Sequence, residues 1–255
     1  MQQLQHQMMG YDRAAAMFTP DGRLLQVEYA RKTVNRVSMV IGITYKDGVL
    51  LLADKRVDEK LIDPDSVKKI HKLTNNIIAG LAGHISDGRA LIETLRIRAQ
   101  QNKLRFGEDI DVYSIVKEVC DIKHGQTLYG GVRPFGVFFL IAGKDQKGHS
   151  LYMTDPSGIF FKYKAKAMGA GQVKANEILE AEYKDNLSEK DALSLATKAL
   201  VEGSEKEIQP DKLEALSIKK SIEDISQLAK ELVSKYPKPK KEIKDNDKKP
   251  DTDEE

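Results

Sequence analysis

Residues 38–55 read SMVIGITYKDGVLLLADK and contain two apolar runs on either side of Lys46-Asp47-Gly48. An Asp-Gly pair between two apolar runs is a strong signal for a β-hairpin. The second run, VLLLA (49–53), offers no polar residue to either face of a strand. Both faces of that strand must therefore be buried, as in a sheet covered on both sides.

On either side of this hairpin, the predicted elements alternate between blocks of strands and blocks of helices. An amphipathic helix is predicted at 24–35, and a second hairpin at 68–73 and 76–83. Two sheets packed face to face with helices outside would cover such strands, so the predicted fold class is α+β. Downstream we expect helices at 85–104 and 109–124, strands at 135–143, 150–155 and 158–164, helices at 171–184 and 189–203, a strand at 214–220, and a last helix capped by residues 221–224.

The two ends of the chain differ from the body. Residues 1–10 show no hydrophobic periodicity, and we expect them to be mobile. Residues 237–255 contain six lysines, seven acidic residues and three prolines, with Ile243 as the one apolar residue. A segment of this composition cannot bury enough apolar surface to fold. We therefore predict a folded body that ends near residue 236 and a disordered charged tail.

Composition excludes several classes of protein. The net charge of +2 gives no electrostatic reason to expect a nucleic acid or an anionic membrane as a partner. The longest apolar run, 135–142, is too short to span a bilayer, and the N-terminus lacks the layout of a signal peptide. The single cysteine, Cys120, rules out a disulfide within the chain. These features predict a cytoplasmic protein.

Common catalytic and cofactor motifs are weak in this sequence. The five histidines lack ligand spacing, and Cys120 lies on an apolar helical face, so we expect no metal and no cofactor. Gly169-Ala170-Gly171 opens a helix but has Lys174 where a dinucleotide fingerprint needs a third glycine. Asp54, Lys55 and Lys69 lie at strand ends, where they could tune a nucleophile or serve as ordinary solvated charges.

Three stretches, in this order, resemble one known family. They are YDRAAAMFTPDGRLLQVEYA (11–30), GVLLLADKRV (48–57) and YGGVRPFGV (129–137). Together they are similar to the α-type subunit of the proteasome core particle, in its archaeal form, and the similarity covers about residues 9–235. The resemblance implies a four-layer αββα sandwich of the N-terminal-nucleophile hydrolase type, in a homo-heptameric α ring that stacks on proteasome β subunits.

The resemblance also implies that this chain is not itself an enzyme. In the catalytic relatives, the chain begins with a threonine whose own α-amine is the base. Here Ser38 falls at the position of the nucleophile and Asp54 at that of its supporting carboxylate, but the nitrogen of Ser38 is an amide. Val37 precedes it, where self-cleavage usually follows a glycine. We therefore expect no catalytic residue in this chain, with the active sites on the β subunits.

By the same resemblance, residues 1–20 form a flexible segment that gates a central pore. The gate residues implied are Tyr11, Asp12, Arg13, Pro20 and Tyr29. The helix at 24–35 would lie on the ring face, with its apolar stripe buried between neighbouring subunits at about 25 cal/mol per Å². Unfolded proteins would be the substrates that this gate admits.

The resemblance further implies a pocket for the C-termini of a regulatory ATPase ring, which end in hydrophobic-Tyr-any. Gly22, Leu24, Lys69 and Gly83 would form it, with the Lys69 ammonium pairing to the terminal carboxylate. The chain departs from the family at Val37, in place of a glycine, and at His84, in place of an apolar residue. A loop would line the annulus through which substrates enter, made of Tyr129, Gly130, Gly131, Val132, Arg133 and Pro134.

Two alternatives of other classes stay open from the residues alone. One is a self-processing hydrolase that uses Ser38 or Thr44 as its nucleophile. The other is a small-molecule binding module built on Gly169-Ala170-Gly171. The mass of the intact chain separates the first from a gating subunit, and a nucleotide titration tests the second.

Overall fold

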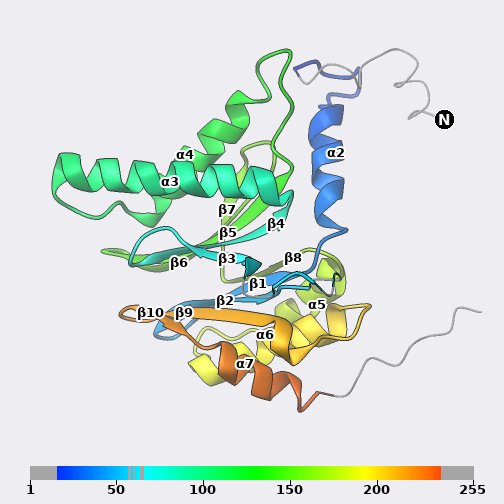
Figure 1. The fold of residues 1–255 in the computed structure, drawn as a ribbon, viewed down its shortest axis with the longest axis vertical. Coiled ribbons are helices and arrows are strands. Elements are labelled where there is room, and N and C mark those ends of the chain that lie inside the picture. The colour runs from blue at the N-terminus through cyan, green and yellow to red at the C-terminus, as the bar shows by residue number, and fades with distance from the viewer. Residues whose placement is uncertain (1–15, 57–58, 60, 64–65, 237–255) are drawn as a thin grey trace, which may run out of the picture.

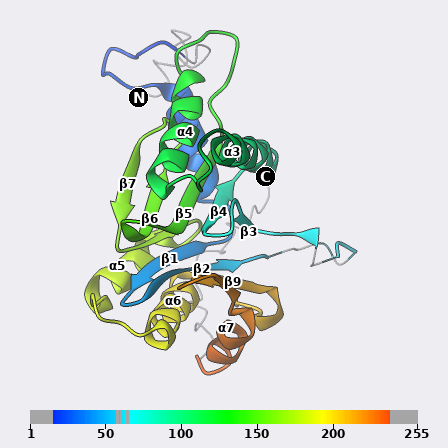
Figure 2. The same ribbon diagram turned by 90° about the vertical axis from the view of Figure 1, so that its left-hand side faces the viewer.

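The computed structural model describes residues 16–56, 59, 61–63 and 66–236. Two five-stranded antiparallel sheets lie face to face, in the strand orders β10-β9-β2-β1-β8 (the first sheet) and β3-β4-β5-β6-β7 (the second sheet). Figures 1 and 2 show α3 and α4 over the outer face of the second sheet, and α5, α6 and α7 over that of the first. The predicted four-layer αββα sandwich of the N-terminal-nucleophile hydrolase type is confirmed.

The predicted elements occur in the predicted order with small shifts at their ends, but the strands at residues 165–168 and 222–224 and the 3₁₀-helix at 210–212 were not among them. The first sheet contains β1 (Val40–Tyr45), β2 (Gly48–Asp54), β8 (Ala165–Met168), β9 (Leu213–Ile218) and β10 (Ile222–Asp224). The second contains β3 (Ile70–Lys72), β4 (Ile77–Gly83), β5 (Val137–Asp145), β6 (Gly148–Thr154) and β7 (Phe160–Tyr163). The helices are α2 (Leu25–Val34), α3 (Ile85–Phe106), α4 (Val112–Gly125), α5 (Gln172–Glu182), α6 (Glu189–Gly203), the 3₁₀-helix η3 (Pro210–Lys212) and α7 (Ser226–Val233).

The hairpin of β1 and β2 lies at the centre of the first sheet, as its sequence predicts. Val40 pairs with Ala53 and Tyr45 with Gly48, so Lys46 and Asp47 form a two-residue turn. All seven residues of β2 are buried, and so are all seven of β4 in the facing sheet. The sheets approach closely at Gly80, where a Cβ atom would lie 2.7 Å from Cγ1 of Val40. Glycine is therefore required there for the two sheets to meet.

The last helix differs from its prediction. Residues 222–224 form strand β10, in which Ile222 pairs with Ile218, so of the predicted cap it is Asp224 that contacts the helix. The helix begins at Ser226, whose backbone nitrogen donates to the Asp224 carboxylate at 2.9 Å. A short hairpin and an amphipathic helix place apolar residues at similar spacings here, so the hydrophobic pattern alone assigned Ile222 to the wrong element.

Helix α2 stands beside the sandwich and contacts β4 and β5 (Figure 1). Its apolar stripe is already buried within this chain, with Val34 only 1% exposed, so the prediction that a neighbouring subunit buries it is wrong. Arg31 fixes the outer side of the helix through Nη2, which lies 2.6 Å from an Asp155 carboxylate oxygen in the β6–β7 turn. The apolar stripe of α2 is thus buried against the ends of strands in the second sheet. The other buried residues of the stripe are Leu25, Val27 and Ala30.

Candidate functional site

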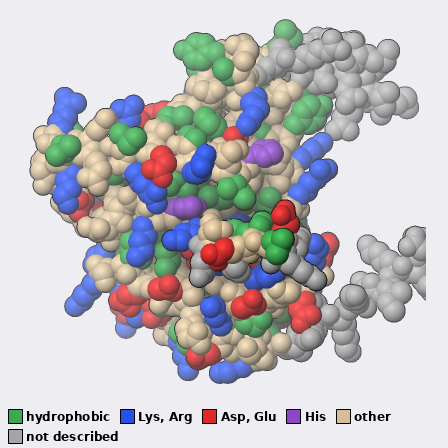
Figure 3. Space-filling model, in the orientation of Figure 1, with side chains coloured by type: hydrophobic (Ala, Val, Ile, Leu, Met, Phe, Trp, Pro, Cys, Tyr) green, Lys and Arg blue, Asp and Glu red, His purple; other side chains and the backbone are tan. Residues whose placement is uncertain are grey.

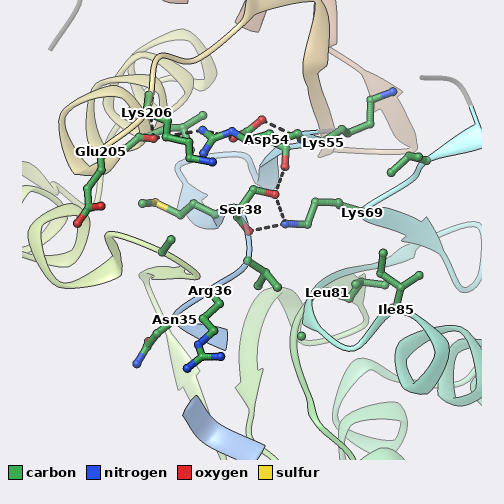
Figure 4. Close-up of a pocket in the computed structure, with 18 of the residues that line it drawn as sticks. Asn35, Arg36, Ser38, Asp54, Lys55, Lys69, Leu81, Ile85, Glu205 and Lys206 are labelled. Carbon is green, nitrogen blue, oxygen red and sulfur yellow. Dashed lines mark hydrogen bonds and ion pairs between the residues drawn. The ribbon is translucent and has the colours of Figure 1, made fainter. Parts of the chain in front are cut away.

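A cavity of about 570 Å³ opens where the connector between α2 and β1, residues 35–38, meets the ends of β2 and β4 (Figure 4). Among the described residues, its wall carries six basic side chains against two acidic ones, so an anion would be attracted into it. The basic residues are Arg36, Lys55, Arg56, Lys68, Lys69 and Lys206, and the acidic ones are Asp54 and Glu205.

Lys69 reaches Ser38 at the centre of the cavity (Figure 4). Its Nζ donates to the Ser38 hydroxyl at 2.7 Å and also to the Ser38 carbonyl oxygen. The Ser38 hydroxyl in turn donates to the backbone carbonyl of Asp54 at 2.6 Å. The Asp54 carboxylate points elsewhere and pairs with Arg56, at 2.8 Å from Nη2. Both oxygens of Ser38 are therefore held by Lys69, while the nearby acid is neutralised by an arginine.

Burial shifts the pKa values of Lys69 and Asp54. Desolvation lowers the pKa of Lys69 to about 8, against the attraction of Asp54, which favours the ammonium. Desolvation also raises the pKa of Asp54, opposed by Arg56 and Lys69. Lys69 is 8% exposed, yet it lines an open cavity. It is therefore a poorly hydrated cation that a ligand can reach, which favours a strong bond to an incoming carboxylate.

The cavity wall also has an apolar part. Val37, Val67, Leu81 and Ile85 lie among the basic residues, and Ile85 is 67% exposed. A site that combines a buried cation with an exposed aliphatic surface suits a chain end carrying a carboxylate and apolar side chains.

The structure brings only some residues of the predicted activator pocket to the cavity. Lys69 and Gly83 line the cavity, whereas Gly22 and Leu24 do not. Gly22 has a φ of +75° in the turn at residues 19–22, and Leu24 precedes the first residue of α2. Of the two departures from the family, Val37 lines the cavity and His84 does not.

Only part of the predicted gate can be located. Tyr11, Asp12 and Arg13 lie outside the described residues. Pro20 is exposed in a turn that closes where the Gly22 nitrogen donates to the Thr19 carbonyl at 2.8 Å. Tyr29 is half-buried on α2, with the Lys32 ammonium 5.6 Å from its ring centroid. A clustering of Pro20 and Tyr29 with the earlier residues stays a prediction.

Residues 129–134, the annulus loop, project from the end of the molecule between α4 and β5. Figures 1 and 2 place this end beside the start of the described chain. Leu128 and Tyr129 are exposed here, and Figure 3 shows hydrophobic side chains at the same end, whereas positive and negative side chains are mixed over the rest of that face. The loop therefore lies at the same end of the molecule as residues 16–20, the first described residues of the chain.

The annulus loop is anchored at its base by a residue that the sequence did not indicate. Asp87, near the start of α3, receives two bonds from the Arg133 guanidinium, each 2.7 Å, and a third from the Gly136 nitrogen at 2.8 Å. Arg133 lowers the pKa of Asp87 and so keeps this carboxylate ionised. The two residues are 46 positions apart in the chain, so no local spacing could reveal the pair.

The weaker candidates occupy packing positions. Cys120 is buried, as predicted. Gly171 lies so close to the end of α6 that a Cβ atom would meet the Gly203 carbonyl oxygen at 1.9 Å. Within residues 16–56, 59, 61–63 and 66–236, no cluster of three or more His, Cys, Asp or Glu side chains could hold a metal ion. No helix in the same ranges is long and apolar enough to cross a bilayer.

Comparisons with known proteins agree with the fold and with the sequence of residues 11–32. The model of the family described as "Proteasome subunit" matches residues 34–218, and the model of the N-terminal signature of A-type proteasome subunits matches residues 11–32. The chain is 46% identical over 228 residues to "Proteasome subunit alpha" of Archaeoglobus fulgidus, with 89% of this chain and 92% of the relative covered. It is 46% identical over 210 residues to the protein of that name from Methanopyrus kandleri, with 82% and 85% covered.

A third relative, "Proteasome subunit alpha" of Methanococcus maripaludis strain S2, is 42% identical over 229 residues, with 90% of this chain and 88% of the relative covered. The family model for the fold and the signature for the N-terminal segment match adjoining parts of one chain, in the order that the three sequence stretches predicted. The chain therefore belongs to the proteasome subunit family, as an α subunit of the core particle.

Proposed function

We propose that the chain is a non-catalytic gating subunit of the proteasome core particle. Seven copies form the outer ring, gate the entrance with their N-termini, receive the C-termini of a regulatory ATPase ring and template assembly of the β ring. The observation that carries the docking role is the cavity beside Lys69. Membership of the family supports a homo-heptameric ring, the β subunits as partners and a cytoplasmic location, which are part of this proposal.

The cavity has the chemistry that a hydrophobic-Tyr-any C-terminus requires. The ammonium of Lys69 has three protons, and Ser38 accepts two of its hydrogen bonds. A terminal carboxylate, which is a stronger acceptor than either Ser38 oxygen, would draw these hydrogen bonds to itself and would also be attracted by the surrounding basic side chains. Val37, Leu81 and Ile85 offer the apolar surface for the side chains that precede that carboxylate. Gly22 and Leu24 would complete the pocket from a neighbouring subunit.

The bonds around Ser38 support the absence of hydrolysis. Its hydroxyl hydrogen is directed to the Asp54 carbonyl, and Lys69 donates to its oxygen, so neither neighbour serves as a base in this arrangement. Its own nitrogen is an amide, which cannot accept a proton at neutral pH. The active sites of the particle would then lie on the β subunits, with unfolded proteins as substrates.

Substitution of Lys69 tests the docking role. Particles assembled from the Lys69→Ala chain and β subunits should lose stimulation by the ATPase ring, because the docked carboxylate has lost its ion-pair partner. The rings should still assemble, which native mass spectrometry checks. Stimulation equal to that of the parent particle would refute docking at this cavity, and loss of rings would give Lys69 a structural role instead.

A deletion tests the gate. Removal of residues 1–12 should speed hydrolysis of an unfolded protein several-fold, because the segment obstructs bulky chains more than small ones. Cleavage of a tripeptide should change less. Equal acceleration of both substrates would contradict a gate built from these residues.

A further inference from the structure

The connector at residues 35–38 is the part of the chain through which the cavity meets α2. It runs from the end of α2 at Val34 to the start of β1 at Val40. On one side, the Ala170 nitrogen donates to the Val37 carbonyl at 2.8 Å. On the other, Lys69 donates to the carbonyl and the hydroxyl of Ser38. Lys69 therefore both lines the docking cavity and holds the connector in place.

These two roles of Lys69 compete. A carboxylate is a stronger acceptor than a neutral hydroxyl or carbonyl, because charge-assisted hydrogen bonds are roughly twice as strong as neutral ones. The Asp54 carboxylate does not compete in this way, since it is paired with Arg56. An anion that enters the cavity can thus draw the ammonium away from Ser38.

Loss of the Lys69 bonds leaves the connector less restrained. Ser38 would keep its bond to the Asp54 carbonyl, and Val37 its bond from Ala170. The connector is hydrogen-bonded to the end of α2, because the Val37 nitrogen donates to the Val34 carbonyl at 3.2 Å. At its other end α2 follows the turn that contains Pro20. A shift of Ser38 is therefore passed to the segment that leads to the N-terminus.

We infer that Ser38 is a positioning residue that transmits occupancy of the Lys69 cavity to α2. When a carboxylate binds, the Lys69 ammonium transfers its hydrogen bonds from Ser38 to that carboxylate. The inference rests on the proposed docking function and adds the route by which docking reaches the N-terminal segment. It also gives a non-catalytic role to Ser38, which falls at the position of the nucleophile in the catalytic relatives.

The test separates binding from its effect. Particles assembled with β subunits are titrated with a peptide that ends in hydrophobic-Tyr-any and a free carboxylate, and hydrolysis of an unfolded protein is followed. In Ser38→Ala, peptide affinity should stay within about threefold of the parent, while maximal stimulation falls at least threefold. Ser38→Cys, of similar shape but with a weak acceptor, should lose stimulation in the same direction. Ser38→Thr, which keeps the hydroxyl, should restore it.

A matched control is Ser226→Ala, because the Ser226 hydroxyl also donates to a strand carbonyl, that of Ala215, but lies outside the cavity. This variant should match the parent. Full stimulation in Ser38→Ala would overturn the inference, and so would a parallel loss of affinity and stimulation, which would make Ser38 part of the docking surface. Failure of the peptide to bind the parent particle would instead refute the proposed function.

A second measurement needs no substitution. Hydrogen exchange in the parent particle should rise at the amides of residues 36–39 when the peptide is added, since the connector loses its Lys69 bonds. Unchanged or slower exchange at these amides, with the peptide bound, would overturn the inference even where the Ser38 variants fail to assemble.

Discussion

Two buried lysines occupy different regions of this molecule. Lys69 is 8% exposed and lines the cavity at the end of the sandwich, whereas Lys123 is completely buried between α4 and the second sheet. Among the described residues, neither has a carboxylate as a hydrogen-bond partner, and burial lowers the pKa of each, to about 8 for Lys69 and about 7 for Lys123. Only Lys69 can be approached by a ligand.

Lys123 is enclosed by groups that hold it in place. Its Nζ donates to the Val137 carbonyl at 2.9 Å and to the Thr154 hydroxyl at 2.8 Å. It also lies 4.8 Å from the centroid of the Phe139 ring, within the range of a cation–π interaction. These contacts connect the end of α4 to the start of β5 and the end of β6. Burial alone therefore does not identify a functional lysine, and access from a cavity is the feature that distinguishes Lys69.

The largest effect expected from this comparison is on binding of the C-terminal peptide. Lys69→Met should weaken binding by about 10- to 150-fold, because a hydrogen bond to a charged group contributes roughly 1.5–3 kcal/mol. Lys123→Met should leave the affinity within twofold, since Lys123 cannot reach the ligand. Isothermal titration of assembled rings measures both variants, and an equal loss in both would remove the distinction between the two lysines.

A smaller effect concerns the pH dependence of the same binding. The peptide carboxylate requires the protonated form of Lys69, whose pKa in the free protein is about 8. Affinity should therefore be constant below pH 7 and fall by up to about tenfold per pH unit above pH 8. Lys69→Arg should bind with little change over pH 6.5–9.5, because arginine stays protonated. A peptide with an amidated C-terminus is the control, and identical pH profiles for Lys69 and Arg would contradict this assignment.

The smallest effect is on stability, and it concerns Lys123. Its pKa is lowered from 10.5 in the unfolded chain to about 7 in the fold, so between these values the unfolded chain binds more protons. The free energy of unfolding should therefore rise with pH across this window, with no contribution to the slope below pH 7. In Lys123→Met this contribution disappears, and the difference in melting temperature between variant and parent should change by several degrees between pH 6.5 and 9. A difference in melting temperature between variant and parent that stays constant over this pH range would show that Lys123 does not titrate in it.

The sequence predicted the layers better than the site. The apolar runs around Asp47-Gly48 determine a hairpin buried on both faces, and the structure confirms it. The spacing of Val112, Ile115, Val119 and Cys120 predicts the buried face of α4, which continues to Lys123 at the next turn. From the sequence alone, a lysine at this position is expected to be exposed to solvent. Its hydrogen-bond partners, Val137 and Thr154, come from distant strands, so local spacing does not indicate them.

Contacts between distant segments explain what the sequence missed. Lys69 and Ser38 are 31 positions apart, and their hydrogen bond depends on how the two sheets face each other. Family resemblance and positions at strand ends indicate Ser38 and Lys69, whereas no recognisable spacing does. Asp87 had no signal at all, since an acid in the first turn of a helix is ordinary.

The bond between Arg133 and Asp87 has a consequence for the size of an opening. The annulus loop is fastened near its base, and among the described residues a Cβ atom placed at Gly130 or Gly131 would meet no heavy atom within 4 Å. A projection fixed at one end bends from that end, and small rotations at the base become larger displacements at the tip. In the proposed ring, each copy would carry the same Arg133–Asp87 pair, so the stiffness of this pair would limit how far the tips move and would thereby influence the width of the proposed entrance.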